Sequence, residues 1–324
     1  MAKPAPITFH VPASAANIGP GYGMLAIALD LPLHVTIEPR TDGEVVVERR
    51  DGPALTVDDR RHDPLLRGLR AGAELLDVSL QKGVTLLVDG TIPRGTGLGT
   101  ISAGYAAGLG AAARLARKKW TPGQLLDSLV PLGGDPAHGA ASMLGGLCTT
   151  VPVGAPGDQI RRYQPLQFPI HGSWQFVVVL PDVALGTADS KRVLPPTLPH
   201  AVAGRTAGRV VGVLTALAQG DEDLLRTCLF DETHVPYRRT LYTGLEQALT
   251  AGRDAGAAGA TICGHGPSLL AMTTDAGRTA DIGKAMIDAL GRAHHKATAL
   301  TLHVAHYGAL PLQAASTPQD APTA

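Results

Sequence analysis

Short runs of apolar residues alternate along this chain with longer stretches in which apolar residues recur every three or four positions. The short runs, bounded by Gly, Pro and Asp, predict strands at 34–39, 44–49, 83–89, 176–181 and 298–306, and a strand, glycine turn and strand over 257–274. The longer stretches predict helices at 64–78, 102–116, 122–132, 187–194, 199–218, 221–229, 239–253 and 277–292. Helices and strands are mixed in both halves without an internal repeat, so we predict an α+β fold.

A region rich in Gly and Pro, from about Gly154 to Gly172, separates the two halves of this pattern. We therefore expect two domains, one over residues 1–165 and one over residues 166–310. The last residues, 311–324, are mostly Ala, Pro, Thr, Ser and Gln without periodicity, which predicts a flexible tail.

Composition narrows the class of protein. Hydrophobic residues make up 44% of the 324 positions and charged residues 17%, which excludes a globally disordered chain. The 28 Lys and Arg residues balance 28 Asp and Glu residues, so we expect neither a nucleic-acid partner nor a membrane partner. The 3 cysteines form no Cys-x-x-Cys pair, which argues against a disulfide framework or a structural zinc site. We see no apolar run close to the roughly 18 residues of a membrane span and no signal peptide, and we expect a cytoplasmic protein.

A glycine-rich segment, Pro93-Arg-Gly-Thr-Gly-Leu-Gly-Thr100, lies between a predicted strand and a predicted helix. Glycines let the backbone approach a phosphate closely, and the free N–H groups at a helix start bind anions. The alternative is an ordinary glycine-rich turn at a strand–helix junction. As a phosphate loop, the segment would bind a nucleotide through Pro93, Gly95, Thr96, Gly97, Leu98, Gly99, Thr100 and Ser102.

Two further segments give this loop a context. Val11–Gly23 reads VPASAANIGPGYG, and Gly264–Ser268 reads GHGPS. In this order and at these separations, the three segments resemble the motifs of the GHMP small-molecule kinases, and within them most of all homoserine kinase. The resemblance covers residues 7–307. It implies a ribosomal-S5-like N-terminal domain, a ferredoxin-like C-terminal domain, a homodimer, and transfer of the γ-phosphoryl group of ATP to a small alcohol with Mg²⁺ as the second cofactor.

The metal site implied by the resemblance departs from the family pattern. Where the family has Gly-Leu-Gly-Ser-Ser, this chain has Thr100 and then Ile101, so one hydroxyl remains. The family's metal-binding Glu, counted back from a Gly-Gly pair, falls on Asp127, whose side chain is one methylene shorter. We therefore expect Thr100 and Asp127 to hold Mg²⁺. The alternative for Asp127 is a solvated helix residue.

The substrate pocket implied by the resemblance departs further. Asn17 is retained, but the acid that holds the substrate ammonium is replaced by Gly23. The family's His and Asn in the pocket fall on Asp135 and His138. In the motif that gives the family its first carboxylate-binding arginine, this chain has Lys191 followed by Arg192. The motif that gives the second arginine is intact and supplies Arg238. The complete set of expected substrate-binding residues is Asn17, Gly23, Asp135, His138, Thr187, Lys191, Arg192, His234, Arg238, Gly264 and His265.

These departures shape the predicted chemistry. Lys191 or Arg192 together with Arg238 would still bind an anion, although a lysine lacks the bidentate fork of arginine. A glycine at position 23 cannot neutralise a buried cation, so the ammonium site is lost unless Asp135 replaces it. We expect a kinase for a small hydroxylated acid, or an amino acid, in which Asn17, His138 and Thr187 serve catalysis.

Within this scheme Asn17 would orient the acceptor hydroxyl, and His138 would accept its proton near neutral pH. Other interpretations stay open: Thr187 as a helix cap, His234 as a structural histidine and His265 as a solvent-facing one. For the whole chain the alternatives are an authentic homoserine kinase of threonine biosynthesis, and a repurposed or catalytically silent fold that binds a ligand or performs non-kinase chemistry.

Overall fold

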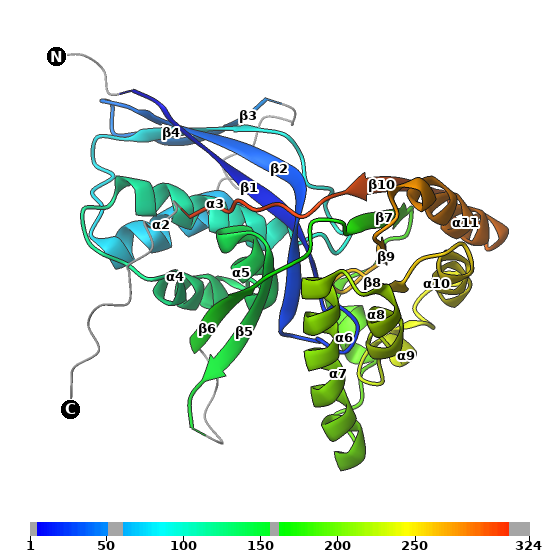
Figure 1. Ribbon diagram of the computed structural model, residues 1–324. Helices are drawn as coiled ribbons and strands as arrows, with labels where there is room; N and C mark the ends of the chain where they lie inside the picture. Colours follow the sequence, from blue (N-terminus) through cyan, green and yellow to red (C-terminus); the bar gives the residue numbers. More distant parts are fainter. Residues whose placement is uncertain (1–4, 51–60, 156–161, 311–324) are drawn as a thin grey trace.

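The computed structural model describes residues 5–50, 61–155 and 162–310, and the predicted tail 311–324 lies outside these ranges. Two β-sheets lie next to each other, and helices pack against both (Figure 1). The first sheet has the strand order β3-β4-β2-β5-β6, and β1 also pairs with β2. Its strands are β1 (Ile7–Ala16), β2 (Leu25–Pro39), β3 (Val45–Arg49), β4 (Val84–Asp89), β5 (Leu147–Val153) and β6 (Arg162–Phe168).

The long strand β2 organises this sheet. It pairs with β1 from Ile7↔Ile37 to Ala16↔Ala26, and its other edge pairs with β4 near its end and with β5 near its start. The helices that cover the sheet are α2 (Pro64–Leu76), α3 (Thr100–Leu115), α4 (Pro122–Leu129) and α5 (Pro136–Leu144). Helices α2 and α3 lie so close together that a Cβ at Gly108 would be only 2.1 Å from the Leu65 carbonyl oxygen.

The second sheet has the antiparallel order β10-β7-β9-β8, which is that of a ferredoxin-like fold. Its strands are β7 (Gln175–Pro181), β8 (Gly259–Ile262), β9 (Leu269–Thr273) and β10 (Ala297–Leu302). Helices α10 (Leu245–Asp254) and α11 (Thr279–Arg292) cover one face, where Val177 and Leu269 lie in their core. The opposite face, with Phe176 and Leu270, joins the core of the N-terminal half, so both sheets share a continuous apolar interior.

The remaining described helices are α6 (Thr187–Arg192), α7 (His200–Gln219), α8 (Glu222–Cys228) and α9 (Val235–Arg238). Among the described helices, α7 alone is long and apolar enough to cross a membrane by length and composition, which is weak evidence for a span. It carries Arg205 and Arg209, both of which pair with Glu232. The sequence predicts no membrane span, and these two arginines interrupt the apolar residues of α7.

The predicted α+β architecture is confirmed, and the differences have local causes. The helix expected at 122–132 ends at Leu129 and continues as a 3₁₀ turn, Val130–Leu132, around a proline. The helix expected at 239–253 begins only at Leu245. Pro236 lies in the first turn of α9, where a missing N–H is tolerated.

Several elements were missed because their residues are buried without a clear period. Strand β1 and the first half of β2 are almost continuously buried, so they show no alternation of apolar and polar residues. Strand β6 crosses the expected 165/166 boundary and pairs with β5, so the N-terminal sheet extends to Phe168. The chain also returns to the N-terminal half after β10, where Val304 bridges to Leu29 and the Ala309 amide donates to the Ser142 carbonyl.

Candidate active site

The predicted phosphate loop connects β4 to α3. Its hydroxyl side chains stabilise the turn, since Thr96 and Thr100 both donate to the Pro93 carbonyl, over 2.9 and 2.8 Å. In the part of the chain that the structure describes, no side chain caps the first turn of α3, which follows Gly99, so its backbone N–H groups are free to bind an anion. All three glycines of this loop have positive φ: Gly95 (71°), Gly97 (90°) and Gly99 (72°).

The turn between β8 and β9 packs directly on this loop, as the family motif predicts. The Ser268 amide donates to the Thr96 carbonyl over 3.1 Å. A Cβ at Gly97 would lie 2.3 Å from the Cys263 carbonyl oxygen, so only glycine fits there. Burial raises the pKa of the Cys263 thiol to about 12, which makes this cysteine unreactive at neutral pH.

A pocket of about 260 Å³ opens between the loop, the start of α5, helix α6 and the β8–β9 turn. Thr187, Lys191 and His265 line it from the C-terminal half. Ile101, which replaces the family hydroxyl, also lines it and is 57% exposed. The residues on the N-terminal side are Gly95, Gly97, Gly99, Thr100, Ile101, Ser102, Gly133, Gly134, Asp135, Pro136 and His138.

His138 is a buried histidine at the edge of this pocket. Its Nδ1 lies 2.8 Å from the Ser14 hydroxyl. Burial lowers the pKa of His138, and the nearby Asp135 carboxylate opposes this shift, so the imidazole is neutral at pH 7. A neutral imidazole whose Nδ1–H donates to Ser14 keeps the Nε2 lone pair for accepting a proton.

Asp135 caps α5, because its Oδ1 accepts hydrogen bonds from the amides of Ala137 and His138. Its own amide donates to the Ser102 hydroxyl over 3.1 Å. No hydrogen bond or ion pair of Oδ2 is present among the described residues, so one carboxylate oxygen remains for a ligand in the pocket.

Arg238 is fully buried and held by three acceptors. Its Nη1 donates to His234 Nδ1 over 3.1 Å and to the Gly264 carbonyl over 3.2 Å, and its Nε donates to the Ser190 carbonyl. His234 Nε2 donates to the Gly19 carbonyl, so this histidine is neutral, in agreement with a pKa lowered by burial. Within the described part of the chain, Arg238 Nη2 has no partner, which leaves one donor for an anion.

Tyr22 covers this arginine from solvent. The guanidinium carbon lies 5.2 Å from the centre of the Tyr22 ring, which is also 5.3 Å from the His234 ring. Burial lowers the pKa of Arg238, and Tyr22 and Asp231 oppose the shift. Tyr22 itself is 36% exposed, so its ring lies between Arg238 and solvent.

Asn17 uses both ends of its amide to shape the loop before β2. Its Oδ1 accepts from the Gly23 amide over 2.7 Å and its Nδ2 donates to the Gly264 carbonyl over 2.8 Å. The structure shows Asn17 in contacts that position this loop, and its contact with the acceptor hydroxyl stays a prediction. Gly23 has a φ of 73°, and nothing lies within 4 Å of a Cβ built on it, so the position of the family's acid is open space.

The two candidate cations on α6 separate. Lys191 lines the pocket, while Arg192 pairs with Asp189 at 3.3 Å outside it. Thr187 shares the pocket face with Lys191 and is not the cap of α6, which is Gly186. His265 points into the pocket rather than to solvent, and burial together with nearby Arg238 lowers its pKa to about 4.

Comparisons with known proteins agree with this geometry. Residues 66–146 match the GHMP kinases N terminal domain, and residues 213–293 match GHMP kinases C terminal. A homoserine kinase of Synechococcus sp. (strain RCC307) is 31% identical over 299 residues, which cover 90% of both chains. The chain belongs to the GHMP kinases. One from Trichormus variabilis, also a homoserine kinase, is 29% identical over 309 residues, 95% of this chain and 100% of that one.

Solved GHMP kinase structures share the fold. The homoserine kinase from Cytophaga hutchinsonii superposes with a TM-score of 0.81 at 23% identity, over 95% of this chain and 98% of that chain. The L. major mevalonate kinase in complex with R-mevalonate gives a TM-score of 0.69 at 16% identity, over 93% and 96%. The fold class and the kinase assignment predicted from the sequence are thereby confirmed.

The structure does not place Asp127 at the phosphate loop of this GHMP kinase. Its Oδ1 accepts from the Tyr163 amide over 2.8 Å, and its Oδ2 lies 3.7 Å from Arg162, so the carboxylate ties α4 to β6. Asp135, rather than Asp127, presents a carboxylate to the pocket with Thr100. In the described ranges no three His, Cys, Asp or Glu side chains gather around a possible metal position.

Sequence reasoning overlooked three residues of this kinase site. Ser14 and Tyr22 lie inside the first motif, next to residues that were singled out, and their polar groups were the available signal. Asp231 accepts hydrogen bonds from the amides of Thr233, His234 and Val235 and so fixes the start of α9. Asp231 lies four residues before α9 begins at Val235, and the cap position is His234, so the usual helix-start pattern gives no signal for Asp231.

Proposed function

We propose that this GHMP kinase transfers the γ-phosphoryl group of ATP to the hydroxyl of a small hydroxy acid that carries no α-ammonium group. The observation that carries the proposal is the charge around one pocket. Lys191 lines it, and Arg238 lies buried behind the lining, near enough to His265 to lower its pKa together with Lys191. A carboxylate fits this pair, and Arg238 Nη2 is the donor still free for it.

The absence of an acid at position 23 supports the second half of the proposal. An ammonium group that leaves water needs a carboxylate partner, and Gly23 faces open space. Asp135 is the carboxylate among the described pocket residues, its backbone amide donates to the Ser102 hydroxyl at the start of α3, and its Oδ2 is the oxygen without a partner there. We assign this oxygen to the binding of Mg²⁺ rather than to the binding of an acceptor ammonium group.

ATP would bind with its phosphates on the backbone of Gly95–Thr100 and at the start of α3. The oxygens that fit Mg²⁺ are the Thr100 hydroxyl and Asp135 Oδ2, since magnesium is usually held by few protein ligands plus phosphate oxygens. When bound, Mg²⁺ neutralises charge on the transferring phosphoryl group. This assignment replaces the expected pair of Thr100 and Asp127.

The chemical step follows from these positions. The acceptor oxygen attacks the γ-phosphorus of ATP. The bond between the γ-phosphorus and the β–γ bridging oxygen breaks, and ADP leaves. His138 Nε2 accepts the proton of the acceptor hydroxyl, since burial keeps this imidazole neutral at pH 7 and its Nδ1 is hydrogen-bonded to Ser14. Lys191 and Thr187 lie on the pocket face of α6, where they can orient the acceptor.

A second candidate acceptor is homoserine itself. The relatives with about 31% identity are homoserine kinases, and Asp135 could pair with the ammonium group if it turned from the loop to the acceptor. The homodimer and the place in threonine biosynthesis stay predictions drawn from the resemblance, and the cytoplasmic location stays a prediction drawn from the pattern of apolar residues.

The test is ADP release from MgATP with a matched pair of acceptors, 4-hydroxybutyrate and L-homoserine, which differ only in the α-amino group. The proposal expects a higher kcat/KM on 4-hydroxybutyrate. A preference for homoserine would favour the second candidate. Calorimetry of MgATP on the same sample separates these outcomes from the silent fold, in which no nucleotide binds.

A further inference from the structure

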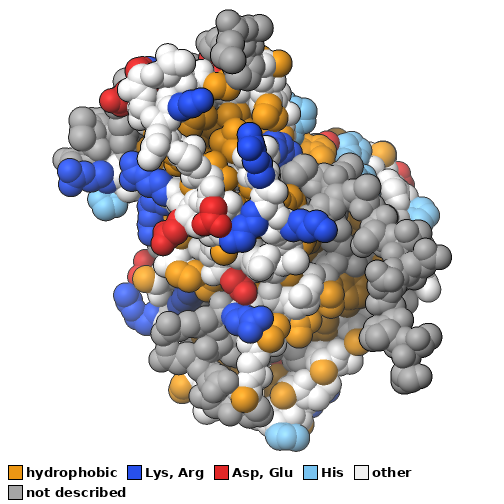
Figure 2. Space-filling model, turned by 90° about the vertical axis from the view of Figure 1, so that its left-hand side faces the viewer, with side chains coloured by type: hydrophobic (Ala, Val, Ile, Leu, Met, Phe, Trp, Pro, Cys, Tyr) orange, Lys and Arg blue, Asp and Glu red, His pale blue; other side chains and the backbone are white. Residues whose placement is uncertain are grey.

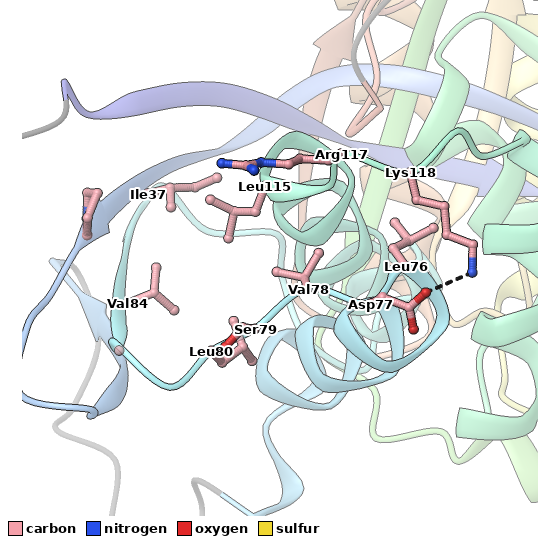
Figure 3. Close-up of a pocket in the computed structure, with 12 residues that line it drawn as sticks. Ile37, Leu76, Asp77, Val78, Ser79, Leu80, Val84, Leu115, Arg117 and Lys118 are labelled. Atoms are coloured by element: carbon pink, nitrogen blue, oxygen red, sulfur yellow. Dashed lines mark hydrogen bonds and ion pairs between the residues drawn. The ribbon is translucent and has the colours of Figure 1, made fainter.

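A second and larger pocket, of about 490 Å³, lies at the other end of α3 from the phosphate loop. Thr100 starts this 16-residue helix in the catalytic pocket, and Leu115 ends it in the second pocket. At about 1.5 Å per residue the two sites are more than 20 Å apart along the helix. The walls come from the ends of α2, α3 and β2 and the start of β4 (Figure 3).

The interior of this distal pocket is aliphatic. Its most buried lining side chains are Ile37, Leu76 and Val84, which are 1–3% exposed. Val78 and Leu115 are half-buried and extend the same apolar surface (Figure 3). Because the described residues that line the pocket include no aromatic ring, it suits an aliphatic chain better than a flat base or ring.

The rim of the distal pocket is positively charged. Lys118 pairs with Asp77 at 3.0 Å, so these two charges cancel. Arg117 is exposed, its side chain extends along the pocket towards Ile37, and it has no hydrogen-bond or ion-pair partner among the described residues (Figure 3). On the left-hand face of Figure 1, Lys and Arg side chains gather around hydrophobic surface (Figure 2).

We propose that the distal pocket binds an aliphatic carboxylate, with the chain on Ile37, Leu76 and Val84 and the carboxylate on Arg117. The single unpaired positive charge of Arg117 matches the single negative charge of a carboxylate. The planar guanidinium presents two parallel N–H groups to a carboxylate, a geometry that an alcohol or an amine cannot use. The volume lies within the usual range of about 300–1,000 Å³ for small-molecule sites. This inference does not depend on the identity of the kinase substrate.

The first experiment measures binding of decanoate to the full chain by calorimetry, with decanol as a matched ligand that lacks the charge. The proposal expects saturable binding of one decanoate per chain and binding of decanol at least about tenfold weaker, the usual contribution of a charge-assisted hydrogen bond. Equal affinity for both ligands, or no saturable binding of decanoate, would overturn it.

Variants then locate the site. Arg117→Gln should weaken decanoate about tenfold, since it removes the charge-assisted contact. Lys119→Gln is the matched control, because Lys119 is an exposed cation two positions on that does not line the pocket, and it should leave the affinity unchanged. Ser79→Trp fills the mouth of the pocket from an exposed position and should abolish binding. Wild-type affinity in Arg117→Gln or in Ser79→Trp would refute the assignment.

Discussion

The Nδ1 atom of His138 lies 2.8 Å from the hydroxyl of Ser14, which fixes the orientation of a buried imidazole beside the phosphate loop. If His138 accepts the proton of the acceptor, His138→Ala should lower kcat by about 10²–10⁴-fold, the usual contribution of a general base. The affinity for MgATP should not change, because the loop binds the phosphates through its backbone. Steady-state kinetics and calorimetry measure the two quantities separately.

Two further variants separate proton transfer from orientation. Ser14→Ala keeps the imidazole and removes only its partner, so we expect a smaller loss of kcat than in His138→Ala. The wild-type rate should fall at acid pH as His138 becomes protonated, and this acid limb should disappear in His138→Asn. A His138→Asn enzyme with full activity and an unchanged pH profile would contradict a role in proton transfer.

Gly23 offers a gain-of-function test of the acceptor pocket. Gly23→Asp should lower KM for L-homoserine by about 10–100-fold, since a carboxylate–ammonium hydrogen bond contributes roughly 1.5–3 kcal/mol. The open space around Gly23 accommodates the side chain, and its φ of 73° is one that Asp adopts more readily than most residues. Gly23→Asn introduces the same backbone strain without the charge. If Asn and Asp act alike on KM, the missing charge is not what excludes the ammonium.

The free Nη2 of Arg238 predicts a dependence on the acceptor's carboxylate. Arg238→Lys should raise KM for 4-hydroxybutyrate by about tenfold or more, because a lysine lacks the second N–H arm. With 1,4-butanediol, which has no carboxylate, the substitution should leave KM unchanged. Initial rates with both acceptors test this, and an equal effect on the two would show that Arg238 serves only to support the fold.

The candidate site was predictable where its determinants are local. The glycines at 95, 97 and 99 adopt positive φ at the junction of a strand and a helix, as their spacing indicates. Thr187 and Lys191 are four residues apart within a predicted helix, a spacing that puts both on one face, and both line the pocket. Adjacent charges, by contrast, cannot be ranked from sequence, and only the ion pair with Asp189 shows that Arg192 points elsewhere.

The remainder depends on contacts between distant segments. Asp127 was expected at the metal, but the amide that binds its carboxylate belongs to Tyr163, 36 residues away. In the fold, strands β5 and β6 were missed for a similar reason. Their residues pair with each other and with β2, and these partners rather than local periodicity determine their conformation.

The buried histidines predict a loss of stability in mild acid. His138, His234 and His265 all have pKa values lowered by burial, His265 to about 4. The unfolded chain therefore binds protons at a higher pH than the folded chain. Stability is fully present above about pH 6.5 and falls as the pH decreases below it, by up to about 1.4 kcal/mol per pH unit for each group.

Thermal unfolding between pH 7.5 and 4.5 measures this effect. His265→Ser removes one of the three groups and should flatten the fall in Tm. His200→Asn removes an exposed histidine at the start of α7 and should leave the wild-type slope. Parallel curves for wild type and His265→Ser would show that His265 is not titrating in this range.

The contact between α2 and α3 predicts a large cost for the smallest possible substitution. A methyl group at Gly108 would lie 2.1 Å from the Leu65 carbonyl oxygen and 2.3 Å from the Leu69 amide nitrogen, so the two helices must separate to accept it. We expect Gly108→Ala to destabilise the protein by more than about 2 kcal/mol, in the range of overpacked cores.

Gly208→Ala is the control, because Gly208 also lies within a helix, α7, and a Cβ built on it has nothing within 4 Å. There the better helix propensity of alanine should stabilise by roughly 0.5–1 kcal/mol. Urea unfolding of both variants measures the difference, and a neutral Gly108→Ala would mean that α2 and α3 can move apart at little cost.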